Sequence, residues 1–214
     1  MYRSARRSDF RWLGFLLPVV NVLFLLQVGG QDCPDVATSY NNIAIIYKNQ
    51  GKYEEALELY TKSLDIKTRI YGGDNHPDVA TSYTCIGVVY YSQGQYERAL
   101  EYYQKALDID IKVSGQDHPD VAASYNNIGN VYNRQGQYER ALEYYQKGLE
   151  IDIKVSGQDH PDVAVSYQNL AAVYQRQGNH VQTKEMVTKA YHIFLKVLGP
   201  DHPQTQGLKP FVDE

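Results

Sequence analysis

The sequence predicts an all-α solenoid, a fold in which helical hairpins stack on one another. Residues 95–122 read QYERALEYYQKALDIDIKVSGQDHPDVA, and residues 137–164, 42 positions later, repeat this stretch with only two substitutions. Further copies of the pattern, some more diverged and the last partial, begin at Cys33, His76, His118, His160 and His202. A fixed period of this length is the signature of a stacked repeat array.

We expect the chain to have three parts. Residues 1–30 form a hydrophobic leader, residues 31–201 a single repeat array, and residues 202–214 a C-terminal tail or partial repeat. Within the array, the expected repeats are about 33–75, 76–117, 118–159 and 160–201. Because an array grows by adding units, all four repeats are counted as one domain.

The leader combines a basic start with an apolar core. Four arginines precede the apolar stretch at residues 12–28. Val28 and Gly30 suit the −3 and −1 sites of signal peptidase, so a cleaved secretory signal ending near Gly30 is one interpretation. An uncleaved membrane anchor is the second, although the stretch is at the short end of the roughly 20 residues that span a bilayer. A leader fused to a cytosolic module is the third.

The body of the chain is of a cytoplasmic type, in contrast to a leader that suggests the secretory pathway or a membrane. It contains no Asn-x-Ser/Thr glycosylation acceptor. Cys33 precedes the first helix of its repeat, whereas Cys85 lies nine residues beyond the equivalent position of the next repeat. Nine helical residues rise about 13 Å, beyond the roughly 7 Å Cα limit of a disulfide. We therefore expect two free thiols.

The charge of the chain limits the kinds of partner. The formal net charge is −4, and four arginines against Asp9 give the leader +3, which leaves −7 for the rest. An acidic body is a poor match for a phosphate backbone. We expect a protein or peptide ligand and no nucleic acid. Contact with a membrane is expected only through residues 12–28, if the leader is uncleaved. The sequence sets no oligomeric state.

Each repeat is expected to form two helices, called helix A and helix B. In the third repeat, His118-Pro119-Asp120 opens helix A, because Pro suits the first helical position and Asp favours the positive end of the helix dipole. Helix A runs to about Gln135, and Gly136 ends it. Its apolar stripe at helical spacing consists of Tyr125, Ile128, Gly129 and Tyr132. Helix B follows from about Tyr138 to Val155.

Small residues mark the places where helices A and B must approach closely. In the second and third repeats they are Gly87, Ala99, Ala106, Gly129, Ala141 and Gly148. With these residues the pattern resembles the tetratricopeptide repeat. The longer, 42-residue form with GQDHPDVA at the junction is similar to the repeats of kinesin light chain and nephrocystin-type proteins. The resemblance covers residues 33–202 and implies a right-handed superhelix that acts as a protein-interaction scaffold.

The same resemblance implies a concave groove lined by the side of each helix A opposite its apolar stripe. Amides that both donate and accept suit an extended peptide backbone, and arginines suit acidic residues. We expect side chains on this face to lie away from the core, so that their removal changes stability little. The predicted groove residues are Asn41, Lys48, Thr84, Tyr91, Asn126, Asn130, Asn133, Arg134, Gln168, Gln175 and Arg176.

The recurring histidines raise the question of a metal site. They occupy equivalent places in successive repeats, about 10 Å or more apart, whereas zinc ligands lie about 2 Å from one point. We expect them to act at helix starts instead. No nucleophile elbow, phosphate loop or dinucleotide fingerprint occurs. We therefore predict no catalytic, cofactor-binding or metal-binding residues, no cofactor, and a protein that is not an enzyme.

These observations predict a non-enzymatic scaffold or adaptor that binds a peptide segment in its concave groove, similar to the cargo-binding part of kinesin light chain. The alternative is a purely structural or self-associating array without a dedicated groove ligand.

Two further expectations follow from the repeat pattern. Gly148 stands where the second repeat has Ala106, so Gly148→Ala should stabilise its helix by about 0.5–1 kcal/mol. In the last repeat, helix B is more polar, as suits a terminal unit. Gly207 and Pro210 should then stop any further long helix and leave a short tail.

Overall fold

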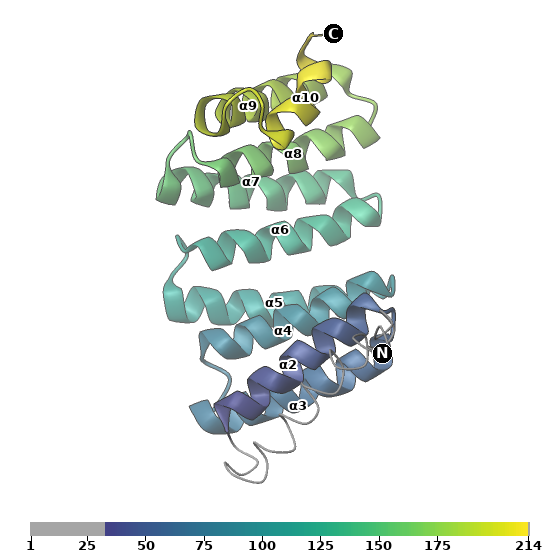
Figure 1. The fold of residues 1–214 in the computed structure, drawn as a ribbon, viewed down its shortest axis with the longest axis vertical. Helices are drawn as coiled ribbons and strands as arrows, with labels where there is room; N and C mark the ends of the chain where they lie inside the picture. Colours follow the sequence, from purple (N-terminus) through teal and green to yellow (C-terminus); the bar gives the residue numbers. More distant parts are fainter. Residues whose placement is uncertain (1–32, 214) are drawn as a thin grey trace, which may run out of the picture. The chain divides into compact units, whose positions relative to one another are not determined.

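The computed structural model describes residues 33–213, so the leader lies outside the described residues. Every regular element in this range is a helix, which confirms the all-α class. The helices alternate as helix A and helix B of successive hairpins (Figure 1). They are α2 (Pro34–Asn49), α3 (Tyr53–Tyr71), α4 (Pro77–Ser92), α5 (Tyr96–Ser114), α6 (Pro119–Arg134), α7 (Tyr138–Ser156), α8 (Pro161–Arg176), α9 (His180–Leu198) and α10 (Pro203–Asp213).

The recurring histidines cap the helices that follow them. Nδ1 of His76 accepts a hydrogen bond from the backbone N–H of Asp78 at 3.1 Å. His118 and His160 make the same contact at 3.3 Å, each followed by Pro at the first helical position. A capping side chain satisfies a backbone donor that has no partner within the helix. The predicted structural role of these histidines at helix starts is confirmed.

The helices end close to the predicted residues. Helix α6 ends at Arg134, one residue before the predicted Gln135, and α7 ends at Ser156, one residue after the predicted Val155. Gly136 follows α6 with φ of +74°, a left-handed conformation that glycine adopts without strain. The next N–H, of Gln137, then bonds back to the carbonyl oxygen of Tyr132 at 2.9 Å.

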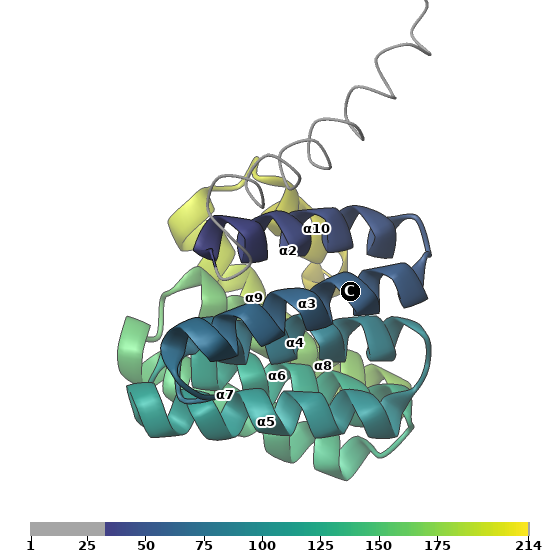
Figure 2. The ribbon, with the colours of Figure 1, turned by 90° about the horizontal axis from the view of Figure 1, so that it is seen from below.

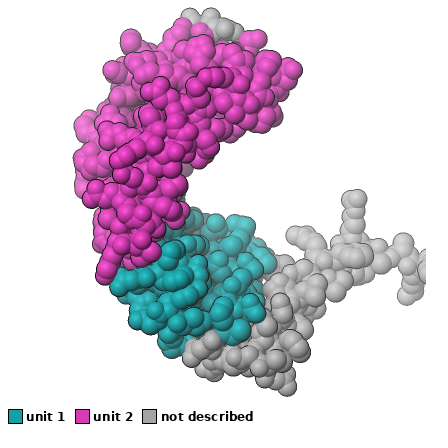
Figure 3. Space-filling view, turned by 90° about the vertical axis from the view of Figure 1, so that its left-hand side faces the viewer, with its two compact units in different colours: residues 1–102 teal, residues 103–214 magenta. Residues whose placement is uncertain are grey.

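The described chain divides into two compact units. Unit 1 ends at Tyr102 and unit 2 begins at Tyr103, within α5 (Figure 3). Unit 1 contains α2, α3, α4 and the first part of α5, and unit 2 contains the remainder up to α10. Each unit has buried clusters of its own.

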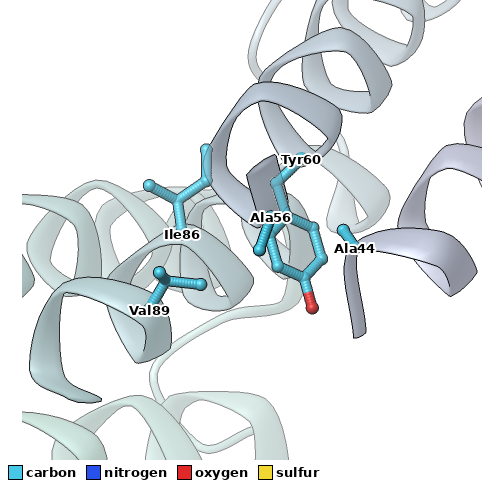
Figure 4. Packing of buried hydrophobic residues seen from close by; sticks show 5 residues of the cluster. All are labelled: Ala44, Ala56, Tyr60, Ile86 and Val89. Carbon is cyan, nitrogen blue, oxygen red and sulfur yellow. The ribbon is translucent and has the colours of Figure 1, made fainter. Parts of the chain in front are cut away.

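In unit 1, Tyr60 of α3 joins the first hairpin to the next helix A. Helices α2 and α3 run side by side (Figure 2). Tyr60 packs with Ala44 of α2 and with Ile86 and Val89 of α4 (Figure 4), and it is only 2% exposed. Burial raises the pKa of its hydroxyl, and the nearby Cys85 thiol adds to the rise. The large ring of Tyr60 is therefore enclosed beside the small side chain of Ala44.

Unit 2 shows how closely the helices approach. A Cβ atom placed on Gly129 of α6 would lie 2.8 Å from Cε1 of Tyr145 in α7. Non-bonded carbon atoms normally keep about 3.5–4.0 Å apart. The Tyr145 ring, which is 1% exposed, therefore lies directly on the backbone of α6. The predicted close approach of helices A and B at Gly129 is confirmed.

Gly148 is more crowded than its counterpart Ala106 suggested. A Cβ atom on Gly148 would lie 3.0 Å from Oδ1 of Asn126 and 3.3 Å from the backbone oxygen of Ala122. The backbone oxygen cannot move without disturbing α6. This crowding offsets the about 0.5–1 kcal/mol that alanine adds inside a helix. The structure therefore gives no support to the stabilisation expected for Gly148→Ala.

The first repeat junction uses a different polar pair from the junction that follows it. In unit 1, Nζ of Lys67 in α3 donates to Oγ of Ser82 in α4 at 3.0 Å. In unit 2, Asp110 of α5 takes the place of the lysine and accepts from Oγ of Ser124 in α6 at 2.9 Å. Asp110 is only 7% exposed. An almost buried carboxylate thus lies at a repeat junction.

The surroundings of Asp110 raise the pKa of its carboxyl group. Burial is the main cause of its raised pKa, because it disfavours the charged form. The hydrogen bond from Ser124 acts in the opposite direction. Among the charged neighbours, the Asp120 carboxylate raises the pKa and His118 lowers it.

The C-terminal segment forms the helix α10, so Gly207 and Pro210 do not stop a further helix as expected. Both residues lie inside α10, which begins after a capping contact from His202, as α4, α6 and α8 do after their own histidines. Leu208 packs against the buried cluster that contains Phe194 of α9. Packing on α9 therefore outweighs the poor helix propensity of glycine and proline, which the sequence pattern alone suggests would dominate.

We expect Gly129→Ala to lower the free energy of unfolding by about 1–3 kcal/mol, because the new methyl group displaces the Tyr145 ring. Gly207→Ala is the matched control, since a Cβ atom there meets nothing within 4 Å. This control should gain up to about 1 kcal/mol. Urea denaturation measures both variants, and a Gly129→Ala protein as stable as the wild type would contradict the close approach.

We expect Asp110→Asn to stabilise the protein at neutral pH, because Asn accepts the Ser124 hydrogen bond without a buried charge. A raised pKa means that the folded state holds the proton more tightly than the unfolded state. The contribution of Asp110 to stability is therefore full below its ordinary pKa, about 4, and is lost as the pH rises through the folded-state pKa.

The stability difference between Asp110→Asn and the wild type should accordingly shrink between pH 7 and about pH 4. Urea denaturation at both pH values measures this difference. Asp108→Asn, which changes an exposed carboxylate of the same helix, is the control and should have little effect. A difference that stays constant with pH would show that the charge of Asp110 is not the cause.

Candidate functional site

Unit 1 carries the first part of the predicted binding face on α2 and α4. Asn41 and Lys48 of α2 and Thr84 and Tyr91 of α4 are all half-buried. Ile45, one turn along from Asn41, is 38% exposed. Equivalent positions of two successive helices A therefore present a mixed polar and apolar surface.

Unit 2 carries the remaining predicted residues on α6 and α8, and we call this set the unit 2 face. Its half-buried members are Asn126, Asn130, Asn133 and Gln168. Its exposed members are Arg134, Gln175 and Arg176. Amides on α6 are thus continued by amides at equivalent places on α8, so the polar character extends over two repeats.

Asn130 is coupled to the core of its repeat. Its Oδ1 atom accepts a hydrogen bond from the hydroxyl of Tyr145 at 2.7 Å. The same tyrosine ring lies on Gly129, so the bond links the predicted binding face to the packing of α6 on α7. The expectation that side chains of this face lie away from the core is wrong for Asn130, because a buried tyrosine hydroxyl needs an acceptor.

Arg176 of α8 forms a bridge to α6, the preceding helix A. Its guanidinium donates to the backbone oxygen of Asn133, near the carboxyl end of α6, at 3.2 Å. A cation at this end of a helix is favoured by the helix dipole. The contact uses one of five guanidinium donors, so Arg176 is oriented while it still has donors for another acceptor.

Several amide oxygens of the face have no partner within the protein. The Oδ1 atoms of Asn126 and Asn133 are buried without a hydrogen bond, and so is Oδ1 of Asn41 at the equivalent position of the first repeat. An unsatisfied buried acceptor costs about 1–3 kcal/mol. The position of Asn41 and Asn126 thus carries an unpaired amide oxygen in the first and third repeats, and Thr84 and Gln168 occupy it in the other two.

Sequence reasoning missed an apolar hollow beside Gln168 and Gln175. Ala172 of α8, Val187 of α9 and Phe211 of α10 help to line it. The available signal was the repeat alignment, in which Val187 stands at the place of Tyr145. Only the structure shows that Tyr145 fills the space between its helices, so the sequence alone does not reveal that Val187 leaves this space open.

The described residues offer little for metal or nucleophilic chemistry. No group of three or more His, Cys, Asp or Glu in residues 33–213 is arranged to hold a metal ion. Cys33 and Cys85 are free thiols, as predicted. Burial raises the pKa of the Cys85 thiol, although Lys67 and Lys48 lower it in part. A thiol with a raised pKa is a poor nucleophile.

The arrangement of capped helical hairpins is that of a known repeat family. The tetratricopeptide repeat family matches residues 35–112, 78–154 and 120–193. The chain belongs to this family. The predicted fold class, a tetratricopeptide-repeat solenoid of stacked helical hairpins, is thereby confirmed.

Solved structures place these tetratricopeptide repeats in the kinesin light chain type, as predicted. BtubC (BKLC) from P. vanneervenii is 28% identical, with a TM-score of 0.76 over 91% of this chain and 76% of that one. Two crystal structures of a kinesin light chain-like protein of Podosopora anserina are 24% and 25% identical, with TM-scores of 0.70. They align with 84% of this chain and with 84% and 85% of their own.

A comparison with curated proteins gives no match. The family and the structural neighbours support a protein-interaction scaffold, a role in which tetratricopeptide repeats typically carry no enzymatic activity.

The leader predictions concern residues 1–30, which lie outside the described residues. Across residues 33–213, no helix combines the length and apolar character that a membrane span requires.

We expect Asn130→Ala to lower the free energy of unfolding by about 1 kcal/mol, because the Tyr145 hydroxyl loses its acceptor. Tyr145→Phe removes the same hydrogen bond by deleting the hydroxyl that donates it. The double variant should therefore lose less stability than the sum of the two, by about 0.5–1.5 kcal/mol. Denaturation of the three variants tests this, with the exposed Gln175→Ala as control. Strictly additive losses would show that the bond contributes nothing.

Proposed function

We propose that this tetratricopeptide repeat protein is an adaptor whose helix A faces bind an extended segment of a partner protein. The observation that carries the proposal is the row of amides on the unit 2 face, where Asn126 and Asn133 of α6 are matched by Gln168 and Gln175 of α8. Each amide offers both donors and acceptors. Such a row suits the backbone of an extended peptide, whose own donors and acceptors alternate along its length.

The energetic cost of the amides favours binding over a merely solvated surface. Serine or alanine at these places would avoid the buried, unpaired oxygens of Asn126 and Asn133. Each unpaired oxygen costs about 1–3 kcal/mol. Local violations of polar pairing of this kind are typical of functional sites.

Arg176 adds a preference for acidic segments. Its guanidinium is held against the backbone oxygen of Asn133, which orients the remaining donors beside the amides. A guanidinium pairs strongly and directionally with a carboxylate. We therefore propose that the bound segment carries an acidic residue where it passes Arg176.

The proposal is tested with a peptide selected from a displayed random library against the full chain. Calorimetry then compares wild type with Gln168→Ala and Arg176→Ala. Loss of an amide hydrogen bond should weaken binding by about 0.5–1.5 kcal/mol, or roughly 2- to 13-fold in Kd. Loss of Arg176 should weaken an acidic peptide more than the same peptide with glutamine in place of its acidic residue.

Glu143→Ala is the matched control, because Glu143 is an exposed residue of helix B that forms an ion pair with Lys147 on the same helix. This variant should bind as the wild type does. Failure to select any peptide, or a loss of affinity in Glu143→Ala alone, would overturn the proposal. The first of these outcomes would favour a purely structural or self-associating array.

A further inference from the structure

The last repeat lacks a tyrosine that the first three repeats share. Tyr60, Tyr103 and Tyr145 occupy equivalent places in helix B, and all three are at most 3% exposed. The fourth repeat has Val187 instead. The acceptor of the Tyr145 hydroxyl is also missing, because Ala172 stands where the third repeat has Asn130. Both the ring and its hydrogen-bond partner are therefore absent from the same place.

The structure has a hollow at this place. Ala171 and Ala172 of α8, Val187 of α9, and Leu208 and Phe211 of α10 help to line it, and its volume is about 190 Å³. An apolar cavity of about 150 Å³ is large enough to bind benzene, so the hollow has room for one aromatic ring. Gln168 and Gln175 of the unit 2 face also border the hollow and supply its amide groups.

A tyrosine ring fills the equivalent place in unit 1. There the Tyr60 ring is enclosed between α2 and α4 (Figure 4), and Cys85 packs against the same cluster. Cys85 of α4 is the counterpart of Phe211 in α10. Helix α10 therefore presents a large aromatic wall, 50% exposed, where an earlier repeat has a small thiol beside a tyrosine.

We propose that the hollow between α8, α9 and α10 is a binding site for an aromatic ring, which takes the position that Tyr145 occupies in the preceding repeat. The ring packs against Phe211 and the apolar lining. A hydroxyl or indole N–H on the ring pairs with the amides of Gln168 or Gln175. The lining contains no charged residue, so a charged group would be desolvated without a partner and is disfavoured.

The ring is carried by a Tyr, Phe or Trp side chain of the partner segment. The assignment of the ring to a partner polypeptide rests on the proposed function, because Gln168 and Gln175 belong both to the unit 2 face and to the border of the hollow. Ring binding itself does not rest on it. An apolar cavity of sufficient size binds a free aromatic molecule without any peptide.

The first experiment uses p-cresol, the free side chain of tyrosine, with the full-length protein. Titration followed by NMR should give saturable shifts at the backbone amides of Ala172 and Phe211. The double variant Val187→Tyr/Ala172→Asn rebuilds the ring and acceptor of the third repeat. It should have a higher Tm than the wild type and bind p-cresol at least about tenfold more weakly, because its own tyrosine fills the site.

Val187→Phe fills the hollow without requiring an acceptor, and it gives the same test if the double variant does not fold. Absence of saturable shifts in the wild type would overturn the proposal. Binding that is unchanged in a folded, cavity-filled variant would also overturn it, because p-cresol would then bind elsewhere.

A second experiment tests the source of the ring. The peptide acetyl-Gly-Ser-Tyr-Ser-Gly-amide should compete with p-cresol, and the same peptide with Ala in place of Tyr should not. Binding of p-cresol without competition by the tyrosyl peptide would overturn the polypeptide source. The adaptor function is tested separately by the effect of Arg176→Ala on a selected peptide, because Arg176 does not line the hollow. Failure of the adaptor function is therefore distinguished from failure of the ring site.

Discussion

The packing of a tyrosine ring on a glycine or alanine is the contact on which the rest of this structure depends. A hairpin can bring helices A and B together only where one side chain is small, and Tyr145 lying on Gly129 fills the remaining space. Tyr60 beside Ala44 serves the same purpose in unit 1. Because the Tyr145 hydroxyl then needs an acceptor, the contact also fixes Asn130. Core packing therefore determines part of the surface on which a partner is proposed to bind.

The repeats differ in the residue that stands at each repeat junction. Asp152 accepts a hydrogen bond from Ser166 just as Asp110 does from Ser124, whereas the first junction uses Lys67. Phe194, at the equivalent place in the last repeat, belongs to an apolar cluster instead. The first and last of these places therefore differ from the two between them, where a carboxylate lies at the junction at the cost of its desolvation.

Much of the fold could be predicted from local sequence. His-Pro-Asp and glycine set the helix ends, because capping and left-handed backbone conformations are local effects. Packing between distant residues could not be predicted in this way. Helix α10 forms despite Gly207 and Pro210, since Leu208 packs on α9. In the candidate site, the sequence indicated which helix face is polar, but the Tyr145–Asn130 bond and the hollow at Val187 require side-chain geometry.

A partner segment is proposed to lie along the helix A face rather than on helix B. NMR of the full chain with labelled side-chain amides, titrated with a selected peptide, distinguishes these two places. Binding on helix A should shift the side-chain amides of Asn126, Asn133, Gln168 and Gln175 and leave Gln146, which is exposed on α7, unchanged. Shifts at Gln146 with an unchanged helix A face would show that the segment binds on helix B instead.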